Sequence, residues 1–182
     1  MTCKVCELYP GFCTKHNDLE EDNEMNITDK MVLFWDGPFS NFEPCEIKLE
    51  GKTFSSSEQA FMYYKALTFD SKEIAKQILA TSKPAEAKRL GRKIIGYDDD
   101  KWSKVRYDVM LKVCRAKYSQ NERLKQKLLY YKGLMFVEAS PVDKIWGIGL
   151  GQDDTRALDI SKWNGQNLLG KVLNEVQAEL LA

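Results

Sequence analysis

A junction between a strand and a helix, at Lys52–Ala66, constrains the fold of this 182-residue chain more than any other stretch. Lys52-Thr-Phe54 has the character of a short strand, whereas the apolar residues that follow Glu58 recur at helical spacing. Ser55-x-x-Glu58 is a capping-box pattern, in which the two side chains satisfy unpaired amides at the start of a helix. The alternative is that Glu58 is a catalytic carboxylate. The pattern alone leaves both interpretations open.

The first 17 residues contain four potential metal ligands, arranged as two close pairs on either side of a Pro-Gly turn. The ligands are Cys3, Cys6, Cys13 and His16. Three thiolates and one imidazole form a common structural zinc set, and a closed set of four leaves no position for a substrate. We therefore expect residues 1–17 to form a structural zinc knuckle. The alternative is a tail that happens to carry cysteines. Residues 18–30, rich in Asp and Glu, are predicted to be an acidic linker to a domain at 31–182.

Charge and composition exclude some classes of function. Lys plus Arg and Asp plus Glu both number 27, so the formal net charge is zero. The chain therefore lacks the general basic surface of a protein that binds nucleic acid or anionic membranes, although a local patch is compatible with this balance. No apolar run approaches the length of a membrane span, and the N-terminus does not resemble a signal peptide. Five cysteines, an odd number, fit a reducing compartment. We expect a soluble, cytoplasmic protein.

The order of the remaining patterns predicts a helix-rich α+β domain with a small sheet. Three strand-like segments are expected, at Met31–Trp35, at Cys45–Phe54 as a hairpin that turns at Gly51, and at Leu134–Glu138. Helical periodicity is expected from Ser55 to about Phe69, from about Ser71, over Pro84–Gly91, from about Lys101 to Tyr118, from Asn121 to Gly133 and after Trp163-Asn-Gly165. The strands do not alternate regularly with helices, which argues against a doubly wound parallel sheet.

The available chemistry is that of carboxylates. The one histidine is assigned to metal, so no Ser-His-Asp or Cys-His arrangement is left. The carboxylates available for such chemistry are Glu58, Glu138, Asp143, Asp153 and Asp154. Carboxylates beside aromatic surfaces suit cleavage of a bond from a sugar to a base, because the oxocarbenium-like transition state is positively charged. Tryptophans, however, belong to a core more often than to a ligand pocket.

Several ordered motifs resemble those of the YbiA-like family, also called NADAR for a proposed link to NAD and ADP-ribose. They are Phe39-Ser-Asn-Phe42, Phe54-Ser-x-x-Glu58 with Lys65, Trp102-x3-Arg106-x3-Met110, Glu138-Ala-Ser-Pro-x-Asp143-x2-Trp146-Gly-Ile-Gly149 and Trp163-Asn-Gly-x-Asn167-Leu-Leu-Gly170. The resemblance covers roughly residues 32–180. It implies a helix-rich α+β fold and N-glycosidase activity without a catalytic cofactor. Bacterial members cleave early riboflavin-pathway intermediates, and others remove ADP-ribose from guanine bases. Both reactions cut a ribose C1–N bond.

The resemblance also implies roles for individual residues. Glu58 would position or activate water, and Asp143 would be the second acidic residue, orienting the ribose or a partner side chain. Trp102 and Trp146 would shape the pocket for base and ribose, while Lys65 and Arg106 would meet phosphate or the carboxylates. The full set of implied substrate-binding residues is Asn41, Phe42, Lys65, Trp102, Arg106, Trp146, Gly147 and Gly149, where the glycines let the backbone approach a ligand.

Two other functions remain open at this point. One is a module that binds ADP-ribose or NAD-derived nucleotides without cleaving them. The other is a zinc-dependent interaction protein that docks to a protein or nucleic acid through the knuckle. The sequence does not choose between riboflavin-pathway intermediates and ADP-ribosylated guanine. The two roles of Glu58 also conflict physically, because a side chain folded back onto Ser55 cannot hold water over a ribose. We expect Glu58 to face a cavity with Trp102, Asp143 and Trp146.

Overall fold

The computed structural model describes residues 25–182 and confirms the helix-rich α+β class. The predicted zinc knuckle lies outside the described residues, as does most of the predicted linker, so the zinc site remains a prediction. One correction concerns the end of that linker. Asn26–Ile27 forms a strand, β1, which pairs with the next strand, so the domain begins before residue 31.

A three-stranded sheet forms the base of one half of the domain. Its order is β1-β2-β5, where β2 is Met31–Phe34 and β5 is Met135–Glu138. Strand β2 runs antiparallel to β1 and parallel to β5, and Phe34 lies opposite Glu138. All four residues of β2 are buried, because both faces of the sheet are covered. An uninterrupted apolar run is the sequence pattern of such a strand.

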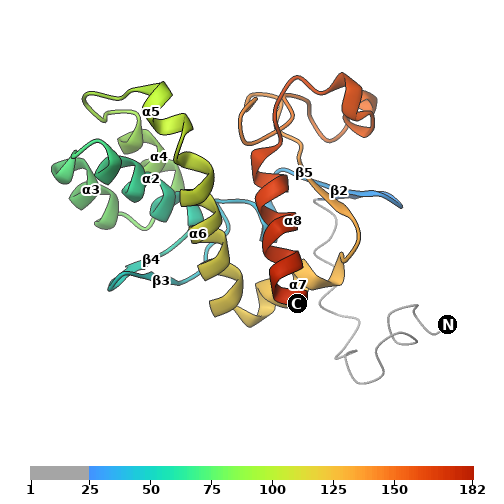
Figure 1. Cartoon of the computed structure of the whole chain (residues 1–182), viewed down its shortest axis with the longest axis horizontal. Helices are drawn as coiled ribbons and strands as arrows, with labels where there is room; N and C mark the ends of the chain where they lie inside the picture. The colour runs from blue at the N-terminus through green and yellow to red at the C-terminus, as the bar shows by residue number, and fades with distance from the viewer. Residues whose placement is uncertain (1–24) are drawn as a thin grey trace.

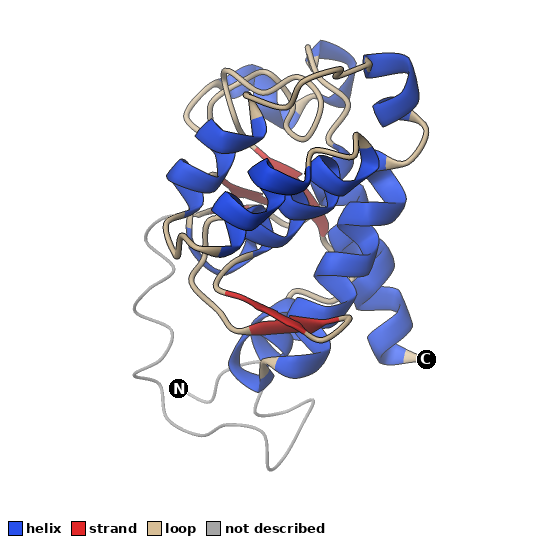
Figure 2. Cartoon of the chain, turned by 90° about the vertical axis from the view of Figure 1, so that its left-hand side faces the viewer, coloured by secondary structure: helices blue, strands red, loops and turns tan. Residues whose placement is uncertain are grey.

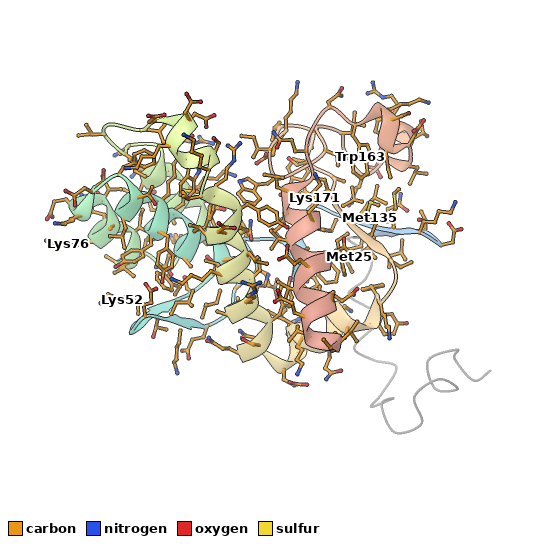
Figure 3. The ribbon with its side chains drawn as sticks, in the orientation of Figure 1. Met25, Lys52, Lys76, Met135, Trp163 and Lys171 are labelled. Carbon is orange, nitrogen blue, oxygen red and sulfur yellow. The ribbon has the colours of Figure 1, made fainter. Side chains whose placement is uncertain are left out.

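The two faces of the sheet pack against different partners. Val32 and Phe34 belong to the main core with the helices. Met31 and Leu33 instead meet a smaller cluster supplied by the segment that follows β5, including Ile148 and Leu150. Trp163 packs against this smaller cluster and donates its indole N–H to the carbonyl of Ala157 at 2.8 Å. Figure 3 shows Trp163 among the loops on the side of the chain that carries the sheet.

The predicted hairpin is confirmed as β3 (Ile47–Leu49) and β4 (Lys52–Phe54). Its two turn residues, Glu50 and Gly51, have φ values of 49° and 70°. Two consecutive positive φ angles are the mark of the turn that best matches the twist of a hairpin. Figure 2 shows the hairpin lying away from the three-stranded sheet.

Helices and short 3-10 turns make up the rest of the regular structure in the described chain. The helices are α2 (Ser57–Thr68), α3 (Lys72–Leu79), α4 (Pro84–Gly91), α5 (Asp99–Ser103), α6 (Arg106–Gln120), α7 (Glu122–Tyr130) and α8 (Leu168–Leu181). The 3-10 turns are η2 (Gly37–Phe39), η3 (Thr155–Leu158) and η4 (Ile160–Lys162). In Figure 1, α2 to α5 gather with the hairpin on one side, and α8 lies with the sheet on the other. Helix α6 lies between them and contacts both α2 and α8.

The single long helix predicted from about Lys101 to Tyr118 is wrong, because the chain breaks between α5 and α6. Val105 leaves helical geometry, with φ −122° and ψ −17°. The break uncouples Trp102 from Arg106, which one continuous helix would hold on the same face. Trp102 turns into the core, whereas Arg106 begins a new helix. Asp98 caps the start of the first piece, since its carboxylate accepts from the Lys101 amide at 3.1 Å.

Helix α8 covers the edge of the sheet that β5 leaves unpaired. The Asn174 side chain accepts from the Phe136 amide and donates to the Leu134 carbonyl. The Asn167 side chain accepts from the Glu138 amide and donates to the Phe136 carbonyl. Two asparagines thereby serve the backbone of β5 as a further strand would. Close approach requires Gly170, where a Cβ atom would lie 2.0 Å from the Phe136 carbonyl oxygen. Over residues 25–182, no helix is long and apolar enough to cross a membrane.

Candidate active site

The first turn of α2 is capped by Ser56 and Gln59, so the predicted pairing of Ser55 with Glu58 is wrong. The Ser56 hydroxyl accepts from the Gln59 amide at 3.2 Å, and Gln59 Oε1 accepts from the Ser55 amide at 2.6 Å. The cap therefore lies one residue later than expected. Gln59 selects this position because its Nε2 also donates to the carbonyls of Ile78 and Thr81. This arrangement leaves the side chain of Glu58 without a capping role.

Glu58 is buried near the helix start and lacks a full set of partners. Its backbone amide donates to the Asn41 carbonyl at 2.9 Å, which fixes the helix start against the loop after η2. The residue is 5% exposed, and its Oε1 has no hydrogen-bond partner within residues 25–182. Burial raises the pKa of Glu58 to about 7, opposed mainly by the positive charge of Lys88 and reinforced by Asp143. The carboxyl group therefore exchanges a proton near neutral pH.

Two further acids enter from the segment after β5. Asp143 Oδ1 accepts from the amides of Ile145 and Trp146, both at 2.8 Å, so this carboxylate shapes its own loop. Glu138 ends β5, and its Oε2 is buried without a hydrogen-bond partner in the described part of the chain. Burial, and then Asp143, raise the pKa of Glu138 to about 8. Glu58 also raises this pKa, which places the three acids within electrostatic reach of one another.

The loop that carries these acids closes tightly around Gly147. A Cβ atom at this position would lie 2.8 Å from the Glu138 carbonyl oxygen and 3.0 Å from that of Asp143. Gly149 has a φ of 70°, and its amide donates to the Asp143 carbonyl at 3.1 Å. The first turn of α8 holds the same loop from outside, since the amide of Asn167 donates to the Gly147 carbonyl.

Cations surround the acids from the helical side. Lys88 on α4 lowers the pKa of both Glu58 and Glu138, and its Nζ lies 5.4 Å from the centre of the Phe42 ring. Sequence reasoning missed Lys88, because no local pattern distinguishes it from other helical lysines. Lys65, predicted to share a face of α2 with Glu58, also acts on that carboxyl group. Its Nζ donates to the Gly91 carbonyl and lies 4.3 Å from the centre of the Tyr97 ring.

The two tryptophans expected in a ligand pocket meet on one phenylalanine. The ring of Phe61 lies 5.2 Å from that of Trp102 and 5.1 Å from that of Trp146. Trp102 is 4% exposed and forms part of the core, whereas Trp146 is half-buried. Phe61 follows Glu58 by three residues and thus shares its helix face. Arg106 lies further out, with its guanidinium 3.6 Å from the Asp99 carboxylate.

Comparison with known proteins assigns the family. The sequence profile of the NADAR domain matches residues 33–181. This chain belongs to the NADAR domain family. It is 42% identical over 171 residues to protein irg-1 of Caenorhabditis elegans, covering 84% of this chain and 81% of that protein. It is 38% identical over 165 residues to an N-glycosidase of Acanthamoeba polyphaga mimivirus, covering 84% of this chain and 97% of that protein. The NMR structure of Escherichia coli YbiA superposes with a TM-score of 0.69 and 30% identity over 87% of this chain and 89% of that one.

One cavity of this NADAR domain is lined by none of the three acids Glu58, Glu138 and Asp143. It has a volume of about 480 Å³ and is lined by the hairpin and by the loop between α3 and α4, including Ser55, Gln59 and Thr81, but not Glu58. Within residues 25–182, no three Cys, His, Asp or Glu side chains are grouped as metal ligands. The four residues predicted to bind zinc lie outside this range.

The NADAR domain thus brings two carboxyl groups with near-neutral pKa values to one place, from opposite halves of the chain. Glu58 comes from α2 in the helical half, and Glu138 comes from the end of β5 in the sheet half (Figure 1). Groups with pKa values near the working pH are the most efficient at giving and taking protons. Such an arrangement is suited to acid–base chemistry.

Proposed function

We propose that this NADAR-domain protein is an N-glycosidase, which hydrolyses the bond between ribose C1 and a nitrogen of a base. The observation that carries the proposal is Glu58, a buried carboxyl group with one oxygen unpaired in the described chain and a pKa of about 7. The names of relatives support it, since the mimivirus protein and Escherichia coli YbiA are called N-glycosidases. The latter is 33% identical over 144 residues, covering 79% of this chain and 81% of YbiA.

The proposed chemistry follows from the positive charge of the transition state. As the C1–N bond lengthens, charge develops on the ribose, and a nearby carboxylate stabilises it and takes a proton from the attacking water. Glu58 has this role here. Asp143 holds the loop that presents Trp146 to the ribose, while Lys65 and Arg106 meet the phosphate of the substrate. The substrate is either an early riboflavin-pathway intermediate or ADP-ribosylated guanine, because both contain a ribose C1–N bond and phosphate.

The test is to incubate the full-length protein with each of these substrates and to follow the products by mass spectrometry. We expect release of free base with ribose phosphate or ADP-ribose. Glu58→Gln lowers kcat by about 100-fold or more, the usual contribution of a positioned acid or base. Glu73→Gln, an exposed acid on α3, serves as the matched control and retains wild-type turnover.

Two outcomes would contradict the proposal. A folded Glu58→Gln with undiminished turnover would remove Glu58 from the mechanism. Recovery of intact ADP-ribosylated ligand after long incubation with wild-type protein, together with binding by calorimetry, would identify a nucleotide-binding module instead of an enzyme.

A further inference from the structure

Glu138 is a half-buried acid that acts electrostatically on the same group of residues as Glu58, and the proposed function gives it no task. Its Oε2 is buried and has no hydrogen-bond partner in the described part of the chain. A buried carboxyl oxygen without a partner carries a desolvation cost of several kcal/mol when it is ionised. An apolar residue at this position would avoid that cost.

The backbone of Glu138 is held firmly, which fixes where its side chain begins. Its amide donates to Asn167 Oδ1 at 3.0 Å, and its carbonyl accepts from the amides of Ser140 and Ile148 at 2.9 and 3.0 Å. Strand β5 also pairs in register with β2, so Glu138 lies opposite Phe34. The carboxyl group therefore extends from a rigid strand end rather than from a mobile loop.

The surroundings of this carboxyl group are those of Glu58. Asp143 and Lys88 act electrostatically on both glutamates, and Glu58 acts on Glu138 directly. The three groups that act on Glu138 come from three elements: Asp143 from its own loop, Lys88 from α4 and Glu58 from α2. Lys65 and Arg92 also favour the ionised form of Glu58, whereas a negative charge on Glu58 favours the protonated form of Glu138. The two carboxyl groups therefore titrate as a coupled pair.

We propose that Glu138 is a second catalytic carboxyl group, which protonates the leaving nitrogen while Glu58 accepts a proton from water. This inference rests on the proposed N-glycosidase function. The C1–N bond breaks with its electron pair going to nitrogen, which takes the proton of Glu138. Water adds to C1 and gives its proton to Glu58. One water is consumed, and the products are the free base and ribose phosphate or ADP-ribose. The pair is reset when a proton returns from Glu58 to Glu138, directly or through solvent.

Glu138 suits proton donation better than Asp143 does. One oxygen of Asp143 already accepts two backbone hydrogen bonds that shape its loop. Burial, and then Asp143, raise the pKa of Glu138 to about 8, above the value of about 7 for Glu58, so Glu138 is the member of the pair that favours the protonated form at neutral pH. Two carboxyl groups whose surroundings separate their pKa values are the usual basis for dividing acid and base roles.

The test compares Glu138→Gln with wild type on the substrate that the wild-type protein hydrolyses. We expect kcat to fall by about 100-fold or more with little change in KM. Wild-type kcat falls as the pH rises through about 8, and Glu138→Gln lacks this alkaline limb. Asp29→Asn changes an exposed acid between β1 and β2 in the same half of the domain, so this matched control retains both kcat and the alkaline limb. Thermal unfolding confirms that each variant is folded.

A measurement without substrate tests the coupling of the pair. NMR titration of glutamate side-chain carbons follows the pKa of Glu138 directly. Glu58→Gln removes a neighbouring negative charge, so the Glu138 pKa falls in that variant. An unchanged Glu138 pKa would overturn the coupling of the two carboxyl groups.

The possible failures are distinguishable. If wild-type protein hydrolyses neither substrate type, the proposed function fails, and the role of Glu138 fails with it. If wild type is active and Glu138→Gln keeps wild-type kcat and its alkaline limb, only the role of Glu138 is overturned.

Discussion

Ionising a carboxyl group that is buried without partners lowers stability. This domain buries Glu58 and, in Glu138, one oxygen of a second carboxyl group. Glu58 and Glu138 each have an oxygen without a partner in residues 25–182, although Lys88 lies within electrostatic reach of both. A fold selected for stability alone would neutralise or solvate these groups. Functional sites, in contrast, commonly hold groups whose pKa values are shifted by burial.

The pH dependence of stability reports the state of Glu58. Its folded pKa of about 7 exceeds the ordinary value of 4.5, so the folded state binds more protons than the unfolded state between these values. Stability is therefore full below about pH 4.5 and falls as the pH rises through 7. Between pH 5 and pH 8, the unfolding free energy of wild type should fall by about 3 kcal/mol more than that of Glu58→Gln.

Urea unfolding at the two pH values measures this difference. Glu73→Gln, which changes an exposed acid, should follow wild type. A capping role for Glu58 makes the opposite prediction, because a carboxylate that holds a helix start is most stabilising when ionised. Greater stability of wild type than of Glu58→Gln at pH 8 would therefore favour the cap.

At the scale of single residues, the sequence singled out Glu58 and Asp143 but not Glu138 or Lys88 as members of one cluster. Glu138 stood within a recognised motif, yet its burial depends on β5 pairing with β2 and on the loop that closes at Gly147. Lys88 lies thirty residues after Glu58 and reaches it only because α4 packs against α2. Neither arrangement has a local signal in the chain.

Among the elements, hairpins and helices were predictable where local chemistry determines them. Gly51 placed the hairpin turn, and Pro84 opened α4. The cap of α2 was placed one residue too early because Ser55, Ser56 and Ser57 are equally good candidates by type. Hydrogen bonds from Gln59 to the carbonyls of Ile78 and Thr81, 19 and 22 residues away in the sequence, decide among the three serines. The break between α5 and α6 likewise follows from tertiary packing of Trp102 rather than from a helix-breaking residue.

Helix α2 therefore depends on Gln59 rather than on its acidic neighbour. Gln59 accepts from the Ser55 amide and donates to carbonyls that lie between α3 and α4, so Gln59→Ala leaves several buried groups unpaired. We expect a loss of about 2–3 kcal/mol of unfolding free energy. Gln126→Ala, which removes one bond to Glu122 on the surface of α7, should change stability by less than about 0.5 kcal/mol. Chemical denaturation compares the two. Equal effects would show that the cap does not depend on Gln59.

For the molecule as a whole, the site exists only because its two halves are held together. Strands β2 and β5 pair in parallel, and residues 35–134, which contain α2 to α7, form the connection between them. Helix α8, from the end of the chain, then secures β5 along its free edge. The Asn167 bonds lie at the end of β5 that carries Glu138, and the Asn174 bonds lie at the opposite end.

Because Asn167 and Asn174 each make two hydrogen bonds, at opposite ends of β5, they allow a matched test of how the whole fold positions the site. Asn167 has a φ of 51°, so glycine is the replacement that keeps its backbone without strain. Asn167→Gly and Asn174→Ala each remove two bonds to β5, and each should lower the unfolding free energy by about 1–3 kcal/mol. Only Asn167→Gly releases the amide of Glu138, so only that variant should also lose turnover, by about tenfold or more, because small displacements of a catalytic group are costly. Urea unfolding measures the unfolding free energy of each variant, and steady-state kinetics on one substrate measure its turnover. Equal turnover in the two variants at equal stability would show that α8 stabilises β5 without positioning Glu138.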